Sequence, residues 1–194
     1  MDPIERIKNE RQEARNQDDP NADLCFLALS ESEKPSVRTL VLRDVSDDGF
    51  TLFINKTSPK WSIIQTNNKA EMLIWYSTSQ TQYRIYGLIE KLSPSIIEHN
   101  WHRRPPESKY IDYSYESLGP QSSKINSRDD LAGHIKELKE EHQEEEMVKP
   151  ESAAGIVLRP EVIEMLDLNS PSRIHDRRRF DLVDGKWQST QLIP

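Results

Sequence analysis

The feature that most constrains the fold is a series of short apolar, aromatic and β-branched runs separated by turn residues. Runs this short are typical of strands, whereas helices need longer segments with a period of about 3.6 residues. Asp47-Asp48-Gly49 and Asp184-Gly185 lie between neighbouring runs, where glycine supplies the positive φ of tight hairpin turns. The pattern therefore predicts a mainly β, antiparallel barrel or sandwich. The expected strands cover residues 24–30, 36–45, 50–55, 70–77, 82–93, 153–159, 162–168 and 186–192.

Peripheral helices are expected around these strands. Residues 3–16, 59–67 and 94–103 each begin with proline, and the last two follow Ser58 and Ser93 as N-caps. A further helix opens at Ser127, with acids in its first turn and a narrow apolar stripe. We interpret the Glu-rich end of that helix as solvated surface, not as a metal or partner site. No repeat or strong linker divides the chain, so we expect a single domain spanning residues 1–194.

Composition limits the classes of function. The net charge of −7 argues against general nucleic-acid binding. No run approaches the length of a membrane span, and the first residues lack the basic-then-apolar order of a secretory signal. Cys25 is the single cysteine, which excludes an internal disulfide and a cysteine-rich zinc site, and its apolar neighbours predict a buried core residue. We therefore expect a soluble, cytoplasmic protein that binds neither nucleic acid nor membranes.

The glycines are too scattered for a GxGxxG fingerprint or a P-loop. A phosphorylated ligand would have to be held by side-chain cations and helix N-termini, which Arg38, Arg43 and Lys60 could provide. The alternative is that both arginines are outward strand residues that pair with nearby acids. The two arginines are an odd number of residues apart. On one regular strand they would point to opposite faces, and one of them would approach the core or a site.

Motifs for metal or nucleophilic chemistry are weak. His99 and His102 lack a third ligand at helical spacing, and no serine lies in a G-x-S-x-G turn, so we expect no metal site. Near the C-terminal end, alternation along an extended segment would place Arg173, His175 and Arg177 on one face. Three basic groups on one face favour an anionic ligand. A solvated edge strand and a nucleic-acid patch are the alternatives.

Several motifs, taken in order, resemble the FMN-dependent pyridoxamine 5'-phosphate oxidases over nearly the whole chain. The motifs are RTLVLR at 38–43, GFTLFIN at 49–55, SPK at 58–60, HRRP at 102–105 with Ser108, QSS at 121–123 and RIHDR at 173–177. The resemblance implies an FMN-binding split β-barrel that forms a homodimer. Two FMN molecules would lie in clefts at the subunit interface, each with residues from both chains, so a single chain would carry half-sites.

The resemblance also implies roles for individual residues. Arg38 and Lys60 would hold the FMN phosphate. The residues that line or contact the rest of FMN would be Thr39, Leu40, Val41, Leu42, Phe53, Ile54, Gln82, Gln121, Ser122 and Arg177. The substrate phosphate would be held by Arg43, Arg104 and Ser108, with Asn100 at a further position of that site. Arg173 and His175 would lie over the substrate ring as the catalytic residues.

Some of these positions depart from the family pattern. Arg43 stands where lysine is usual, which keeps the charge but offers a planar set of donors. Asn100 takes the position of a tyrosine that helps bind the substrate phosphate, Leu166 that of a tryptophan beside the flavin, and Pro59 that of a basic residue. Losing one phosphate hydrogen bond costs about 0.5 to 3 kcal/mol, which weakens substrate binding without abolishing the site.

The activity implied by the resemblance belongs to vitamin B6 metabolism. It is the oxidation of pyridoxamine or pyridoxine 5'-phosphate to pyridoxal 5'-phosphate, by hydride transfer to FMN and reoxidation by molecular oxygen to hydrogen peroxide. The protein would supply positioning, since phosphate clamps together with Arg173 and His175 fix the ring against the flavin. Two alternatives stay open: an FMN oxidase acting on another aromatic metabolite, and a flavin or pyridoxal-phosphate binding protein with little turnover.

Overall fold

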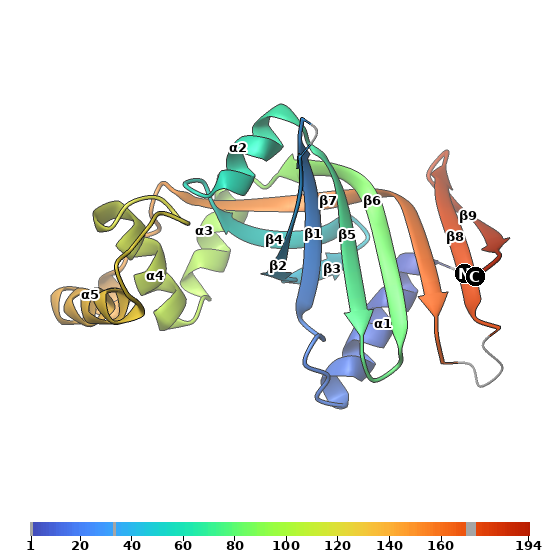
Figure 1. Cartoon of the computed structure of the whole chain (residues 1–194), viewed down its shortest axis with the longest axis horizontal. Coiled ribbons are helices and arrows are strands. Elements are labelled where there is room, and N and C mark those ends of the chain that lie inside the picture. Colours follow the sequence, from blue (N-terminus) through green and yellow to red (C-terminus); the bar gives the residue numbers. More distant parts are fainter. Residues whose placement is uncertain (1, 33, 170–173) are drawn as a thin grey trace. The chain divides into compact units, whose positions relative to one another are not determined.

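The computed structural model describes residues 2–32, 34–169 and 174–194 (Figure 1). Its helices are α1 (Pro3–Asn16), α2 (Pro59–Thr66), α3 (Pro94–His102), α4 (Pro106–Ser117) and α5 (Arg128–Glu141), followed by the 3-10 turn η1 (Glu144–Glu146). Its strands are β1 (Leu24–Glu31), β2 (Lys34–Val41), β3 (Asp44–Ser46), β4 (Gly49–Asn55), β5 (Lys69–Tyr76), β6 (Thr81–Lys91), β7 (Ala153–Asp167), β8 (Asp176–Val183) and β9 (Lys186–Leu192).

The strands form one sheet in the order β2-β1-β5-β6-β7-β4-β3, and β8 pairs with both β7 and β9. The pairs β1–β2, β1–β5, β3–β4, β5–β6, β7–β8 and β8–β9 are all antiparallel. Positive φ angles at Gly49 and Gly185 accompany the hairpin turns that the sequence predicts there. The prediction of a mainly β, antiparallel fold with peripheral helices is confirmed.

Capping residues explain where the helices begin. The side chains of Asp2, Ser93 and Ser127 accept backbone N–H bonds from the first turns of α1, α3 and α5. These bonds satisfy donors that have no partner within a first helical turn. Ser58 behaves differently, because its hydroxyl donates to the carbonyl of Asn55 at 2.7 Å. Its side chain therefore stabilises the turn that leads into α2.

The expected strand over residues 36–45 is broken into β2 and β3. The guanidinium of Arg11 in α1 donates to the carbonyl of Leu42 at the break, and it also binds the Ala22 carbonyl at 3.2 Å and the Asp23 carboxylate at 2.7 Å. The backbone N–H of Leu42 in turn donates to the Asp23 carbonyl at 2.9 Å. The Leu42 N–H bond continues the register of β1 and β2 by one residue, because Leu24 lies opposite Val41. The strand breaks after Leu42, where Arg11 takes its carbonyl and the N–H of Arg43 pairs instead with Thr51 in β4.

Two expected strands, 153–159 and 162–168, are instead one continuous strand, β7. Pro160, which cannot donate to a ladder, lies within this strand. Gly87 in β6 explains the continuity, since a Cβ at Gly87 would lie 1.9 Å from the carbonyl oxygen of Arg159 and 3.0 Å from Cα of Pro160. The missing side chain lets the two backbones approach. The strand list also omitted β8, and the helix list omitted α4.

The chain divides into two compact units. Unit 1 consists of residues 1–52, 66–90 and 156–194, and unit 2 of residues 53–65 and 91–155. In unit 1, strand residues such as Leu27, Met72 and Ile85 are fully buried. Cys25 is buried with them, as predicted, and burial raises the pKa of its thiol to about 12. The assignment of a single domain stays a prediction.

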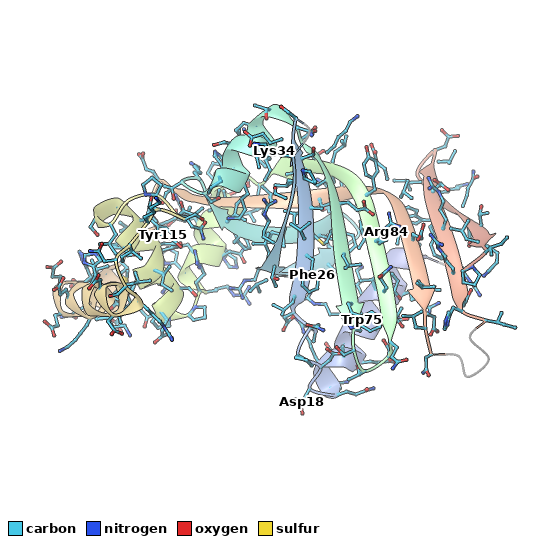
Figure 2. The ribbon with its side chains drawn as sticks, viewed as in Figure 1. Asp18, Phe26, Lys34, Trp75, Arg84 and Tyr115 are labelled. Atoms are coloured by element: carbon cyan, nitrogen blue, oxygen red, sulfur yellow. The ribbon has the colours of Figure 1, made fainter. Side chains whose placement is uncertain are left out.

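The sheet of unit 1 has a second face, called here the outer face, that is only partly covered. Phe26 in β1 lies opposite Thr39 in β2 and Leu73 in β5, and Leu73 lies opposite Arg84 in β6. Figure 2 shows Phe26, Trp75 and Arg84 on this side of the strands. Directly opposed residues share a face, so the outer face carries a mixture of apolar and charged side chains.

Unit 2 is built mainly from helices. Leu138 of α5 packs with Tyr110 of α4 and with Met147, and Ile135 and Tyr113 lie against this cluster. The narrow apolar stripe predicted for α5 is therefore its packing surface.

Candidate cofactor and substrate site

The turn between β4 and α2 in unit 2 is held by one buried amide. Asn55 Oδ1 accepts from the backbone N–H of Thr57 at 2.9 Å and from its hydroxyl at 2.7 Å. Asn55 Nδ2 donates to the hydroxyl of Ser152 at 3.2 Å. These bonds fix the backbone immediately before the first turn of α2, which contains Lys60.

Lys60 and Gln121 are brought together within unit 2. Lys60 Nζ donates to Gln121 Oε1 at 3.1 Å, and the backbone N–H of Gln121 donates to Thr57 Oγ1 at 3.1 Å. Ser122, the next residue, is exposed and has a φ of 77°, a left-handed conformation that favours glycine. Three of the predicted FMN contacts in unit 2 therefore lie at one place, beside the start of a helix.

The other predicted flavin contacts in unit 2 are Phe53 and Ile54 at the end of β4. Phe53 is half-buried, and Ile54 is buried. A Cβ at Gly155 would lie 3.0 Å from the ring of Phe53. Gly155 therefore gives the Phe53 ring the space that it occupies.

Arg38, in unit 1, faces the core side of the sheet. In the β1–β2 register it lies opposite the fully buried Leu27. Nη2 donates to Ser36 Oγ at 2.6 Å, whereas Nη1 is buried and has no hydrogen-bond partner among the described residues. Burial lowers the pKa of Arg38. A buried, unsatisfied guanidinium N–H is costly, and an anion bound there would remove the cost.

Arg43 does not share a regular strand with Arg38. It lies in the break after β2, where its backbone N–H donates to the carbonyl of Thr51 at 3.0 Å, and its side chain is exposed. The two arginines are therefore not on one regular strand, as we had assumed. They still differ as predicted, because Arg38 faces the core side of the sheet and Arg43 faces solvent.

The residues between the two arginines divide between the faces of the sheet. Leu40 lies opposite the buried Cys25, and Leu42 is itself buried. Thr39 and Val41 are exposed on the outer face. A flavin beside this segment would meet the backbone together with only one of these two sets of side chains.

Gln82 and Arg177 lie on the outer face of unit 1. Gln82 is opposite Trp75 in the β5–β6 register. Arg177 donates to Glu164 Oε1 through Nε at 3.1 Å and through Nη2 at 2.9 Å. Arg84 lies 3.5 Å from the same oxygen. Because of these bonds, any contact of Arg177 with FMN would share the guanidinium with the Glu164 carboxylate. Sequence reasoning missed Glu164 as the partner of Arg177.

The two predicted catalytic residues precede β8. Arg173 lies outside the described residues. His175 is half-buried, and its Nδ1 is buried without a hydrogen-bond partner among the described residues. Leu166, in the position of the family's tryptophan, lies opposite Arg177 in the β7–β8 register.

The predicted substrate-phosphate residues of unit 2 lie around the turn from α3 to α4. The Arg104 guanidinium forms an ion pair with Asp112, donates to the Ser108 carbonyl at 3.5 Å and lies 5.3 Å from the centre of the Trp101 ring. Asn100 is tied to its own helix, since Nδ2 donates to the carbonyl of Ile96 at 3.0 Å. Of this set, the structure brings Arg104 and Ser108 together.

Asp112 connects the two predicted binding regions of unit 2, and sequence reasoning missed it. Its carboxyl group pairs with Arg104 and has the Asn55 amide nearby, and burial raises its pKa more than these two neighbours lower it. On one side of Asp112 lies its ion-pair partner Arg104, and on the other the hydrogen-bonded chain of Asn55, Thr57, Gln121 and Lys60. No local sequence signal marks Asn55 or Asp112, because each gains its role from partners far along the chain.

Each of the two cations predicted at the FMN phosphate has, within its own unit, surroundings that suit an anion. Arg38 offers a buried N–H that lacks a partner among the described residues, and Lys60 lies in the first turn of a helix, where anions are favoured. The predicted contacts are divided between the two units: Arg38, residues 39–42, Gln82 and Arg177 belong to unit 1, and the others to unit 2.

Comparison with known proteins identifies the family. Residues 4–93 match the family described as "Pyridoxamine 5'-phosphate oxidase, FMN-binding domain". The pyridoxine/pyridoxamine 5'-phosphate oxidase of Microcystis aeruginosa is 34% identical over 177 residues, which cover 91% of this chain and 80% of that protein. The chain belongs to the pyridoxamine 5'-phosphate oxidase family. A relative of the same name from Pelagibacter ubique is 32% identical over 198 residues, which cover 100% of this chain and 92% of that protein.

Membership of this family confirms the resemblance and the predicted cofactor, because the matched domain is an FMN-binding one. The fold is that of PhzG from Burkholderia lata 383, solved in complex with tetrahydrophenazine-1-carboxylic acid, with a TM-score of 0.87, 24% identity and coverage of 100% of this chain and 93% of that chain. It is also that of a pyridoxamine 5'-phosphate oxidase-related, FMN binding protein from Nostoc punctiforme PCC 73102, with a TM-score of 0.78, 18% identity and coverage of 100% and 99%. The expected FMN-binding split β-barrel is therefore confirmed.

The helices were also compared with the length of a membrane span. Within the described parts of the chain, none is both long and apolar enough to cross a bilayer.

Proposed function

We propose that this protein is an FMN-dependent oxidase that converts pyridoxine or pyridoxamine 5'-phosphate to pyridoxal 5'-phosphate, with molecular oxygen as acceptor and hydrogen peroxide as product. The observation that carries the proposal is a match over nearly the whole chain to relatives of that name. Arg38, Lys60 and Arg104 are each held by side-chain contacts in the folded chain.

The proposed division of labour follows from where the cations lie. Arg38 and Lys60 would hold the FMN phosphate, the first through its buried Nη1 and the second from the start of α2. When bound, FMN supplies the hydride acceptor. Arg104 and Ser108 of unit 2 would hold the anionic group of the substrate. Arg43, which belongs to unit 1, would be a further cation for the same group.

His175 and Arg173 would fix the substrate ring. The buried Nδ1 of His175 has no partner among the described residues, so it is available to hold a proton or to accept a hydrogen bond from the ring's substituents. Arg173 would add a planar set of donors over the same ring. Positioning of this kind removes entropy from the reaction before the chemical step.

We also propose that the protein works as a homodimer that pairs through the outer face of unit 1. That face carries apolar side chains that are only partly covered: Val37 is 66% exposed and Val41 is 49% exposed on the edge strand β2. Thr39, Gln82 and Arg177, three of the proposed FMN contacts, lie on the same face. Burial of this face against a second copy would cover the apolar residues and bring these contacts to an interface.

A second candidate is an FMN oxidase that acts on another aromatic metabolite. The specific observation in its favour is the side chain of Asn100, which is engaged with its own helix where the family has a phosphate-binding tyrosine. Leu166 adds a second difference, because it replaces a flat aromatic ring beside the proposed flavin site.

The test is an assay of the FMN-saturated protein under air with pyridoxine 5'-phosphate and with pyridoxamine 5'-phosphate. We expect one hydrogen peroxide and one pyridoxal 5'-phosphate for each substrate oxidised. Full FMN occupancy without peroxide from either compound would reject this substrate assignment and favour the second candidate. Tight binding of pyridoxal 5'-phosphate without turnover of any tested ring would indicate a binding protein.

A further inference from the structure

The predicted binding site for the substrate phosphate, at Arg104 and Ser108, contains a carboxylic acid, Asp112. Asp112 lies two turns into α4, and its side chain is 7% exposed, against 21% for the Arg104 side chain that it contacts. The pair is therefore largely withdrawn from water, where a carboxylate neutralises a guanidinium most effectively. An anion that approaches Arg104 meets a nearly neutral pair instead of an isolated cation.

The carboxylate also has a fixed polar neighbour. The Asn55 amide, which is held by Thr57 and Ser152, lies near enough to Asp112 to lower the pKa of its carboxyl group. Burial and the ion pair therefore keep Asp112 beside Arg104 in a polar setting that is already in place before a ligand binds. The other contacts of Arg104, with the Ser108 carbonyl and the Trp101 ring, orient the guanidinium independently of Asp112.

We propose that Asp112 is a specificity-determining residue that acts through Arg104 and lowers the contribution of a doubly charged phosphate to substrate binding. The proposal rests on the proposed function in one respect, the placement of Arg104 at the anionic group of the substrate. It implies that the site accepts phosphorylated and unphosphorylated aromatic rings with similar affinities. Asn100 agrees with this, because its amide is already bonded within α3.

The experiment measures binding instead of turnover. The dissociation constants of pyridoxal 5'-phosphate and of pyridoxal are determined on the FMN-saturated protein, and their ratio reports the contribution of the phosphate. We expect this ratio to be below about tenfold in the wild type. Asp112→Asn keeps the size of the side chain and the orientation of Arg104 but removes the negative charge, so it should tighten pyridoxal 5'-phosphate at least tenfold and leave pyridoxal unchanged, a gain of at least about 1.4 kcal/mol.

Three further variants make the result specific. In an Arg104→Met background, Asp112→Asn should have no effect on the ratio, because the acid acts only through Arg104. Glu107→Gln, on the exposed side of the same helix, should behave as wild type. Asp112→Ser provides a second neutral variant, should Asp112→Asn fail to fold as judged by its thermal melt and FMN content.

The outcomes separate this inference from the proposed function. An unchanged affinity of Asp112→Asn for pyridoxal 5'-phosphate would overturn the inference. A weakened affinity would also overturn it, because it would show that Asp112 merely positions Arg104. An effect that persists without Arg104 would overturn it as well. Tighter binding of the phosphate in Asp112→Asn, with no peroxide formed by any variant, would support the inference while rejecting the proposed oxidase activity.

Discussion

Arg38 and Lys60 carry the charges expected at the FMN phosphate, yet their surroundings differ. Lys60 has Gln121 as a neutral partner, whereas Arg38 has one buried N–H without a partner among the described residues. An unsatisfied buried donor destabilises the protein before the ligand arrives. Arg38 therefore illustrates how a binding residue can be unfavourable for folding and favourable for function.

This contrast predicts opposite effects of Arg38→Met on binding and on stability. The affinity for FMN should fall by about 1.5 to 3 kcal/mol, because a charge-assisted contact is lost. The free energy of unfolding of the apoprotein should stay within about 0.5 kcal/mol of wild type or rise, because no buried donor is left unsatisfied. FMN titration and urea unfolding measure the two quantities. Lys56→Met, at an exposed lysine of the turn before α2, is the matched control and should change neither.

His175 and Arg173 should act on turnover and not on FMN retention. If they orient the ring, His175→Ala and Arg173→Ala should each lower kcat/KM by at least about tenfold, about 1.4 kcal/mol of transition-state stabilisation, with an unchanged flavin spectrum. Arg173→Lys should recover only part of the activity, because an ammonium lacks the planar set of donors. Steady-state oxidation of pyridoxine 5'-phosphate by the FMN-saturated variants gives the answer, and wild-type rates in both alanine variants would contradict these roles.

At the scale of elements, the break between β2 and β3 depends on one buried cation. Arg11 binds the carbonyls of Ala22 and Leu42 and the carboxylate of Asp23 from within α1. Arg11→Met should lower the free energy of unfolding by about 3 kcal/mol, since it leaves buried acceptors without a donor. Arg15→Met removes a more exposed partner of the same Asp23, and its cost should be below about 1 kcal/mol. Urea unfolding of the two variants compares them, and equal costs would show that burial of Arg11 is unimportant.

A second prediction for the elements concerns the close approach of β6 and β7 at Gly87. Gly87→Ala would place a methyl group 1.9 Å from the Arg159 carbonyl oxygen, so β6 and β7 would have to move apart. We expect a loss of at least about 2 kcal/mol of unfolding free energy. Gly133→Ala in α5 is the matched control, because a Cβ there has nothing within 4 Å. It should stabilise the protein by up to about 1 kcal/mol, since alanine is the better helix former.

These elements also show what the sequence could predict. The boundaries of α1 and β9 follow from local signals, a cap with proline and a turn with glycine, and both were predicted at the residues observed. The break at Leu42 and the continuity of β7 through Pro160 depend on Arg11 and Gly87, which lie far from them in the chain. The helix α4 was missed because its sequence, rich in serine and tyrosine, has weak helix propensity.

At the scale of the whole molecule, the motifs identified the family and the cofactor but not the partners of the site residues. Arg177 and Arg104 were expected to meet ligands directly, and each is found with a carboxylate, Glu164 and Asp112. Neither acid lies near its arginine in the characteristic motifs. Which cations remain available to a ligand is decided by these tertiary pairs, and the sequence alone could not show them.

The last prediction concerns the outer face of unit 1. Val37 and Val41 are among the more exposed large apolar residues of the described chain, so charging them should cost little in folding. If a second copy covers this face, Val37→Glu together with Val41→Glu should bury unpaired carboxylates at the interface and dissociate the dimer. FMN affinity should fall at least about tenfold at the same time, because each proposed site uses residues of both chains. Sedimentation measures the first effect and FMN titration the second.

A matched control separates loss of the interface from a general effect of added charge. Val183 at the end of β8 is comparably exposed, and its cross-strand partner is Lys186, so Val183→Glu should leave the dimer and FMN affinity intact. A double variant that sediments as a dimer and keeps its FMN would place the interface elsewhere. A double variant that becomes monomeric but retains wild-type FMN affinity would show that the two units of one chain hold the cofactor without a partner, and the half-site arrangement implied by the family would then not apply to this protein.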